Sequence, residues 1–447
     1  MTCAACAFLN ASHALIPGTY FDFRQLGTNW RTEILAGVTT FLTMAYIVLV
    51  NPAILATAGV PIHAATAATC LSAAFGSLLM GIVARYPIAL APGMGLNAYF
   101  TYTVCLKMHI PWQTALGAVF ISGLLFLALT AAGIRQMILR SIPHELYAAV
   151  ASGIGLFIAL IGFHNAGIIV ADPATLVSLG NLRNATAALA IFGLILMVAL
   201  EIRKVRGAIL IGVLATTAAA WALGLVHWSS QNAGLHNLAQ TALQLNIRGA
   251  ISRGLLEIIF VFFFVDLFDN LGTLVAVTKR AGLIAPDNSI PRLNRILFAD
   301  AASTVFGSLT GTSTVTSYVE STAGIAAGGR SGVTAIVAGL LFLVAMAAAP
   351  FVSLVPPAAT APALILVGSM MLATIREIRW HEPLVAVPAF LTLVLIPLTY
   401  SIANGLGFGI IAWAVLHLAT GNWRRQDWLL YALAVLFTLR FIYLGAG

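Results

Sequence analysis

Long apolar runs separated by short polar segments are the feature that most restricts the fold of this chain. A helix needs about 20 apolar residues to cross the hydrocarbon core of a bilayer. Runs near that length recur along the sequence and predict fourteen membrane spans, at residues 32–51, 66–84, 90–106, 113–131, 147–171, 185–200, 207–226, 254–278, 294–308, 313–327, 332–350, 358–375, 384–400 and 404–420. A further apolar stretch at 428–445 is expected to form a fifteenth span or a helix at the membrane interface.

The composition supports the same interpretation. Hydrophobic residues make up 60% of the 447 residues and charged residues only 8%, whereas a soluble domain is about 25% charged. A soluble chain so poor in charge could not cover its surface, but a surface that faces lipid needs no charge. The composition therefore excludes a soluble enzyme, a fibrous protein and a disordered chain.

The net charge of +8 has two interpretations, which are nucleic-acid binding and basic residues in cytoplasmic loops. If the N-terminus is cytoplasmic and the spans alternate, seventeen lysines and arginines lie inside and four lie outside. The four outside are Lys107, Arg183, Arg248 and Arg253. Because a bias of this size sets topology, we expect a multi-pass protein of the cell (inner) membrane with a cytoplasmic N-terminus and no nucleic-acid partner.

The two halves of the chain share short sequence matches. Residues 75–78 (FGSL) recur at 306–309, and residues 122–127 (SGLLFL) are matched in the same order by residues 338–343 (AGLLFL). If each half holds seven spans, an odd number, the second half is inserted upside down relative to the first. The matches thus predict two inverted seven-span repeats, as in many secondary transporters.

Each half also carries one segment rich in residues that interrupt a helix, at 87–100 (PIALAPGMGLNAYF) and 310–320 (TGTSTVTSYVE). Proline removes a backbone donor, and glycine costs about 1 kcal/mol relative to alanine in a helix. Interrupted backbone at membrane depth must be buried in protein or face a water-filled cavity. A corresponding pair of such segments indicates a central solute site. Kinked packing helices are the alternative, and they explain a single segment better than a matched pair.

Four acidic residues lie well inside predicted spans, where charge is costly and usually functional. Asp266 and Asp269 share one helical face at i and i+3. Two close carboxylates in low dielectric should not both be ionised, so this pair is expected to carry a proton, with hydrogen bonds to neighbouring helices as the alternative. Glu320 can accept hydrogen bonds from a solute or stabilise a helix or gate. For Asp300, a structural role as the partner of a broken-helix end is as well supported as a functional role.

Other chemistries find little support in the sequence. There is no Walker A motif and no H-E-x-x-H spacing, and no serine–histidine arrangement stands out. Cys3 and Cys6 form a C-x-x-C without partners nearby. We therefore expect no ATP drive, metal, cofactor or enzymatic activity. Residues 1–30 are expected to be a cytoplasmic tail rather than a cleavable signal peptide.

Three runs together point to one family. Residues 91–98 (APGMGLNA), 266–273 (DLFDNLGT) and 311–321 (GTSTVTSYVES) resemble the azaguanine-type purine permeases of the nucleobase–cation symporter-2 superfamily. The resemblance covers about residues 20–420 and implies an all-α membrane protein whose third and tenth spans are broken by short extended segments. It implies a core domain from residues 31–131 and 254–350 and a gate domain from 132–226 and 351–420, with an external loop at 227–253 and a C-terminal segment at 421–447.

The resemblance also implies a function, namely proton-coupled uptake of hypoxanthine, guanine or adenine by elevator-like alternating access, and a homodimer. The proton is expected on Asp266, Asp269 or Glu320. The residues expected to bind the purine, through side chains or backbone, are Gly95, Asn97, Phe264, Asp266, Asp269, Thr273, Ser317 and Glu320.

Other functions stay open at this point. An anion exchanger or channel of the same fold should place a basic residue near the broken helices, whereas these segments carry Glu320 and no lysine or arginine. A sodium-coupled nucleobase transporter would share the purine site but not the proton. A receptor-like or structural membrane protein would not need acidic residues at the repeat axis.

Overall fold

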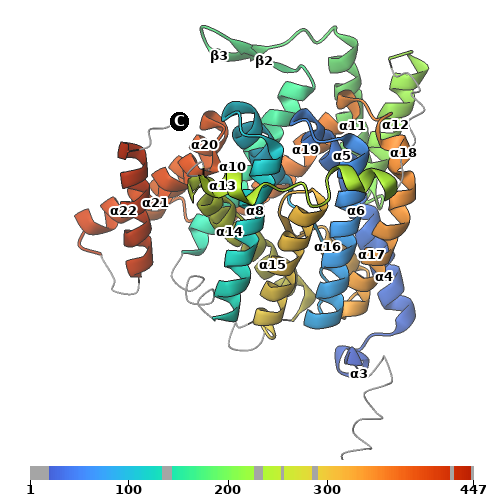
Figure 1. The fold of residues 1–447 in the computed structure, drawn as a ribbon, viewed down its shortest axis with the longest axis horizontal. Coiled ribbons are helices and arrows are strands. Elements are labelled where there is room, and N and C mark those ends of the chain that lie inside the picture. Colours follow the sequence, from blue (N-terminus) through green and yellow to red (C-terminus); the bar gives the residue numbers. More distant parts are fainter. Residues whose placement is uncertain are drawn as a thin grey trace, which may run out of the picture.

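The computed structural model describes residues 20–132, 143–225, 235–252, 256–283, 290–422 and 427–443, which form a bundle of closely packed helices (Figure 1). The elements of the first half are α3 (Phe23–Leu26), α4 (Trp30–Met44), α5 (Ile47–Thr57), α6 (Ile62–Leu79), η1 (Met80–Ala84), β1 (Leu90–Pro92), α7 (Met94–Ala98), η2 (Tyr99–Lys107), α8 (Trp112–Ala131), α10 (His144–Asn165), β2 (Ile169–Asp172), β3 (Leu176–Leu179), α11 (Ala185–Ile202) and α12 (Ala208–Ala222).

The second half begins after a connecting segment that contains two short helices, η3 (Leu235–Gln240) and α13 (Ile247–Ser252). Its elements are α14 (Leu256–Ala281), α15 (Leu293–Thr310), β4 (Val315–Ser317), α16 (Ser321–Ala326), α17 (Gly332–Ala345), η4 (Met346–Ala348), α18 (Ala349–Val352), α19 (Pro357–Met371), η5 (Leu372–Glu377), α20 (Pro383–Thr399) and α21 (Ile402–Ala419). The last helix, α22 (Trp428–Tyr443), packs against α21 at one side of the bundle (Figure 1).

The lengths of these helices fit a bilayer. Among the described residues, seven helical segments are long and apolar enough to cross a membrane, namely Trp30–Thr57, Ile62–Ala84, Trp112–Ala131, His144–Asn165, Ala185–Ile202, Pro357–Glu377 and Ile402–Ala419. Shorter apolar helices lie between them, at Ala208–Ala222, Ile258–Leu267, Gly332–Ala345, Pro383–Thr399 and Trp428–Ile442. The helices fall within a few residues of most predicted spans, while the total of fourteen spans stays a prediction.

One predicted span, 147–171, is wrong at its C-terminal end. The helix α10 ends at Asn165, and the next residues enter an antiparallel hairpin formed by β2 and β3. Gly167 has a left-handed backbone conformation (φ 70°), and such a residue ends a helix even when apolar residues follow it. The hairpin lies at the top of the view in Figure 1, beyond the ends of the helices.

Matched elements of the two halves meet at the centre of the molecule. The strands β1 and β4 pair antiparallel, with Ala91 opposite Thr316. Phe75 of α6 and Phe306 of α15 occupy the same position of the repeated FGSL motif, and their rings stack with centroids 4.2 Å apart. In addition, α8 packs on α15 as α17 packs on α6. Each of these pairs brings together corresponding elements of the two repeats, which requires the repeats to be related by a two-fold axis. The predicted inverted repeat is therefore confirmed.

Side-chain hydroxyls complete the outer edges of the small central sheet. Ser77 accepts a hydrogen bond from the Leu90 N–H (2.9 Å) and donates one to the Leu90 carbonyl (3.1 Å). On the opposite edge, Thr304 accepts from the Val315 N–H (3.2 Å) and donates to the Val315 carbonyl (3.0 Å). Because unpaired backbone groups are costly at membrane depth, these hydroxyls allow extended backbone to persist inside a helical protein.

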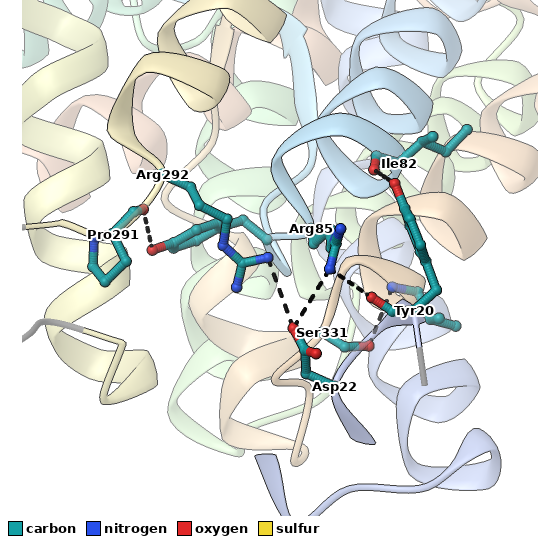
Figure 2. A network of polar contacts seen from close by, with 9 residues as sticks. Tyr20, Asp22, Ile82, Arg85, Pro291, Arg292 and Ser331 are labelled. Atoms are coloured by element: carbon teal, nitrogen blue, oxygen red, sulfur yellow. Dashed lines mark hydrogen bonds and ion pairs between the residues drawn. The ribbon is translucent and has the colours of Figure 1, made fainter. Parts of the chain in front are cut away.

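The segment before the first span contacts both halves at one end of the bundle, as Figure 2 shows. The Asp22 carboxylate lies 3.7 Å from the Arg85 guanidinium, which follows η1, and 4.0 Å from the Arg292 guanidinium, which precedes α15. The Arg85 guanidinium also lies 4.0 Å from the centre of the Tyr20 ring. One acidic residue thus links the two repeats electrostatically.

Candidate functional site

A cavity of about 350 Å³ lies where the two broken segments face the remaining helices. Small-molecule sites usually have volumes of about 300–1,000 Å³. One wall consists of the two broken segments, residues 93–95 and 316–320, together with Tyr46 and Thr273. The opposite wall comes from α10, α19 and η5, with Tyr147, Ala151, Met370, Met371 and Thr374 among its members.

The cavity reaches the surface between the start of α10 and the end of η5. His144 and Glu377 line it there, and their side chains are 58% and 49% exposed and lie 3.4 Å apart. Just outside this mouth, Arg379 donates a hydrogen bond of 2.6 Å to Glu145. That hydrogen bond and the negative charge of Glu145 raise the pKa of the Arg379 guanidinium. This is the end of the bundle that the distribution of basic residues predicts to face the cytoplasm.

Each broken segment turns from a strand into a helix at the cavity wall. Met94 begins α7 directly after β1 and Gly93, while Ser321 begins α16 with three residues between it and the end of β4. The first turn of any helix has N–H groups without partners inside the helix, and these give its N-terminus a partial positive charge. Met94 and Gly95 of the first turn of α7 line the cavity, so this part of the wall can donate backbone hydrogen bonds to acceptors on a solute. The first N–H groups of α16 instead donate to the carbonyls of residues 318–320.

Glu320 is the acidic side chain of this wall. It is partly buried and accepts a hydrogen bond of 2.7 Å from the Tyr46 hydroxyl to its Oε1 atom. Within the described residues, no lysine, arginine or histidine forms an ion pair with it. A carboxylate at this depth is costly to leave without partners, so a proton or an N–H group of a solute would stabilise it.

The residues predicted to bind the solute occupy several different places. Gly95, Thr273, Ser317 and Glu320 line the cavity together, although they come from three separate elements of the chain. Three other predicted residues, Asn97, Phe264 and Asp266, do not appear in its wall. Asp269 lies within α14, and its side chain is outside the described part of the structure.

Asn97 is fully buried behind the cavity wall rather than facing the cavity. Its amide donates to Asn51 Oδ1, and its Oδ1 accepts from the Ser313 hydroxyl. Asn51 in turn donates to Thr69 (2.8 Å) and Thr312 (3.2 Å). This chain of hydrogen bonds, here called the asparagine network, joins the first broken segment to the start of the second.

Phe264 and Asp266 are buried in α14 away from the cavity wall. The Phe264 ring packs on Phe260 and Phe263, with centroids 4.3 and 5.3 Å away. Asp266 lies seven residues before Thr273, so the two share a face of α14 and are about 10 Å apart along the helix. Asp300 is also fully buried, in α15.

Several cavity residues could not be recognised in the sequence. Tyr46 lies in an apolar run that looks like an uninterrupted span, and Met370, Met371 and Thr374 belong to a segment that looks like an ordinary lipid-facing helix. The one signal that could have pointed to them is the position of α19 in the second repeat. Pairing the repeats does not say which helix face would meet the broken segments.

The fold and the cavity define a class, which is an integral membrane protein with inverted repeats and a solute-sized cavity beside two broken helices. The chain belongs to the Permease family (Xan_ur_permease), whose sequence model matches residues 31–408. It is therefore a multi-pass membrane permease rather than an enzyme.

Named relatives agree with this assignment, and one solved structure has a similar fold. The guanine/hypoxanthine permease PbuG of Bacillus subtilis is 47% identical over 438 residues, which are 95% of this chain and 99% of the relative. The adenine permease AdeP of Escherichia coli is 42% identical over 426 residues, or 95% of this chain and 96% of the relative. The transmembrane domain of a cyanobacterial bicarbonate transporter, BicA, has a similar fold, with a TM-score of 0.62, 16% identity, and coverage of 86% of this chain and 98% of that one. The resemblance to azaguanine-type permeases is thereby confirmed.

Proposed function

We propose that this protein is a proton-coupled permease for purine nucleobases, with hypoxanthine, guanine and adenine as candidate substrates. The observation that carries the proposal is the position of Glu320, a carboxylate in the wall of a solute-sized cavity, beside the first turns of two broken helices. The names of the relatives, which are guanine/hypoxanthine and adenine permeases, supply the substrate class.

The chemistry of the wall suits a purine. Purines carry N–H groups on one edge and carbonyl or ring-nitrogen acceptors on the others. Glu320 can accept from the N–H groups, the Thr273 and Ser317 hydroxyls can donate or accept, and backbone N–H groups near Gly95 can donate to the acceptors. Met370 and Met371 on the opposite wall offer polarizable apolar surface to the flat faces of the ring.

We assign the coupled proton to Glu320. The carboxylate has no ion-pair partner among the described residues, and the cavity connects it to the mouth near His144. A carboxyl group that holds a proton on one oxygen can still accept a purine N–H at the other, so the proton and the purine can occupy Glu320 together. Asp266 is the second candidate because it shares a face of α14 with Thr273, and Asp269 stays a prediction from the sequence.

The position of the cavity supports elevator-like alternating access. Its first wall belongs to the predicted core domain and its second wall to the predicted gate domain, so movement of the core along the gate would carry the site across the membrane. Gly95 marks how closely the two approach, because a Cβ atom there would fall on Cγ2 of Ile154 in α10. The open mouth on the predicted cytoplasmic side corresponds to an inward-facing state. We further expect a homodimer in the inner membrane.

Uptake into proteoliposomes tests the proposal. Purified protein is reconstituted, and uptake of radiolabelled hypoxanthine, guanine, adenine and uracil is measured with and without an imposed inward proton gradient. We expect gradient-driven purine uptake that a protonophore abolishes. Purine uptake no higher than in empty vesicles would disprove the substrate class. Uptake that follows a sodium gradient at constant pH would disprove only the proton coupling.

An anion exchanger is the second candidate, favoured by the fold shared with the bicarbonate transporter BicA and by the positive N-terminal end of α7 at the cavity. Glu320 argues against it, since a carboxylate in the wall repels anions. Labelled bicarbonate and chloride in the same vesicles separate the two functions, and purine-independent anion exchange would favour the second.

A further inference from the structure

The helical segment Trp30–Thr57 has a two-residue break beside the cavity, formed by Ala45 and Tyr46. The helix α4 ends at Met44, and α5 begins at Ile47. The Tyr46 side chain is only 1% exposed, yet it lines the cavity. Its hydroxyl donates to Oε1 of Glu320 over 2.7 Å, although the two residues are 274 positions apart. The interruption therefore brings a phenol to the acidic group of the site.

The hydroxyl of Tyr46 limits what Glu320 can do. A carboxylate accepts hydrogen bonds at both oxygens, whereas a phenol supplies a single O–H donor. Bonds from hydroxyls to carboxylates are among the stronger hydrogen bonds in proteins, and the terminal torsion of a free glutamate is broad. With Oε1 accepting from Tyr46, the carboxylate plane is oriented, and Oε2 is the oxygen that a ligand does not have to share.

We propose that Tyr46 is a positioning residue that sets substrate selectivity by occupying one oxygen of Glu320. The inference rests on the proposed function. Hypoxanthine offers Glu320 one ring N–H and needs only Oε2. Guanine offers a ring N–H and an adjacent amino group, and a two-point match to a carboxylate uses both oxygens, so guanine has to share Oε1 with the Tyr46 hydroxyl. Tyr46 favours purines with one donor over purines with two adjacent donors.

The substitution Tyr46→Phe removes the hydroxyl and keeps the ring. We expect KM for hypoxanthine to rise about tenfold, because Glu320 loses the bond that orients it, a hydrogen bond to a charged group. We expect Vmax to stay within about twofold and KM for guanine to change less, because guanine gains access to Oε1. The ratio of Vmax/KM for guanine to that for hypoxanthine should therefore rise about fivefold to tenfold. Should this variant fail to fold, Tyr46→Met, which also lacks the donor, is measured in the same way.

Tyr86→Phe is the matched control. Tyr86 is a buried tyrosine whose hydroxyl donates to the Pro291 carbonyl over 2.8 Å, outside the cavity wall. Its loss should leave the selectivity ratio unchanged. In a Glu320→Gln background, Tyr46→Phe should no longer alter the ratio for the remaining transport or binding, because Tyr46 acts through the carboxylate.

The outcomes separate this inference from the proposed function. An unchanged ratio in Tyr46→Phe, or an equal fall in Vmax for both purines, would overturn the role of Tyr46 while purine transport by the wild type still stands. The same shift in Tyr86→Phe would overturn it as well. If the wild type transports neither purine and binds neither in solution, the proposed function itself fails.

Discussion

The asparagine network leads to a prediction that distinguishes structural support from substrate contact. In the structure, Asn97 lies behind the cavity wall and connects Asn51 with Ser313. The substitution Asn97→Ala removes both bonds. The side-chain oxygen Oδ1 of Asn51 and the hydroxyl of Ser313 then stay buried without the partner that Asn97 supplied. Each buried polar group left without its partner costs about 1–3 kcal/mol. The free energy of unfolding should thus fall by about 2–6 kcal/mol, even without a ligand.

The assay is thermal or denaturant unfolding of the purified protein in detergent, combined with equilibrium binding of labelled hypoxanthine. Asn270→Ala is a matched control, because Asn270 is also fully buried but its amide makes no hydrogen bond within the described residues. We expect a much smaller loss of stability there. Glu320→Gln should show the reverse of Asn97→Ala, with little change in unfolding and a large loss of binding.

A specific result would refute this reasoning. If Asn97→Ala unfolds like the wild type but binds hypoxanthine far more weakly, then Asn97 contacts the purine directly. The broken segment would then have to rotate on binding, so that Asn97 leaves the asparagine network and enters the cavity.

Three further predictions follow from other parts of the structure. Gly95→Ala should slow transport severalfold, because the added methyl group would clash with Ile154 of α10. Adding Ile154→Ala to the same chain should restore the transport rate. A double variant as slow as Gly95→Ala would show that contact between α7 and α10 does not limit the movement of the core. Two backbone N–H groups donate to Asp172 in the hairpin and lower its pKa. The hairpin amides should therefore be protected from hydrogen exchange above the usual aspartate range and lose that protection as pH falls through the lowered pKa. Amide exchange that, after correction for intrinsic rates, does not depend on pH between about 2 and about 5 would contradict this. Asp22→Asn should cost at most about 1 kcal/mol of unfolding free energy, since its ion pairs are partly exposed, and the loss should shrink at high salt; a loss that salt does not change would point to another cause.

The span boundaries could be predicted well because they depend on the length of apolar runs, which a sequence displays directly. The failure at 147–171 has a local cause, the left-handed Gly167. The pairing of the broken segments could also be inferred, because glycine, proline and threonine are unusual at membrane depth. Self-contact at the repeat axis, such as the stacking of Phe75 on Phe306, then follows from the matched motifs.

The direction in which each side chain points could not be inferred. In a broken segment the helical period is lost, so the sequence does not tell whether Asn97 faces the cavity or the asparagine network. Phe264 has neighbours of its own kind and packs on them instead of on a solute. Tyr46 was missed because the interruption between α4 and α5 carries no glycine or proline at its centre.

The most direct measurement of the central claim is equilibrium binding of labelled hypoxanthine to the purified protein and to its Glu320→Gln variant, with Asn270→Ala as a control for general damage. If Glu320 accepts the purine N–H, the variant should bind at least about tenfold more weakly than the wild type, while its unfolding temperature stays close to that of the wild type. Equal affinity in the two proteins would remove Glu320 from the site and contradict the account.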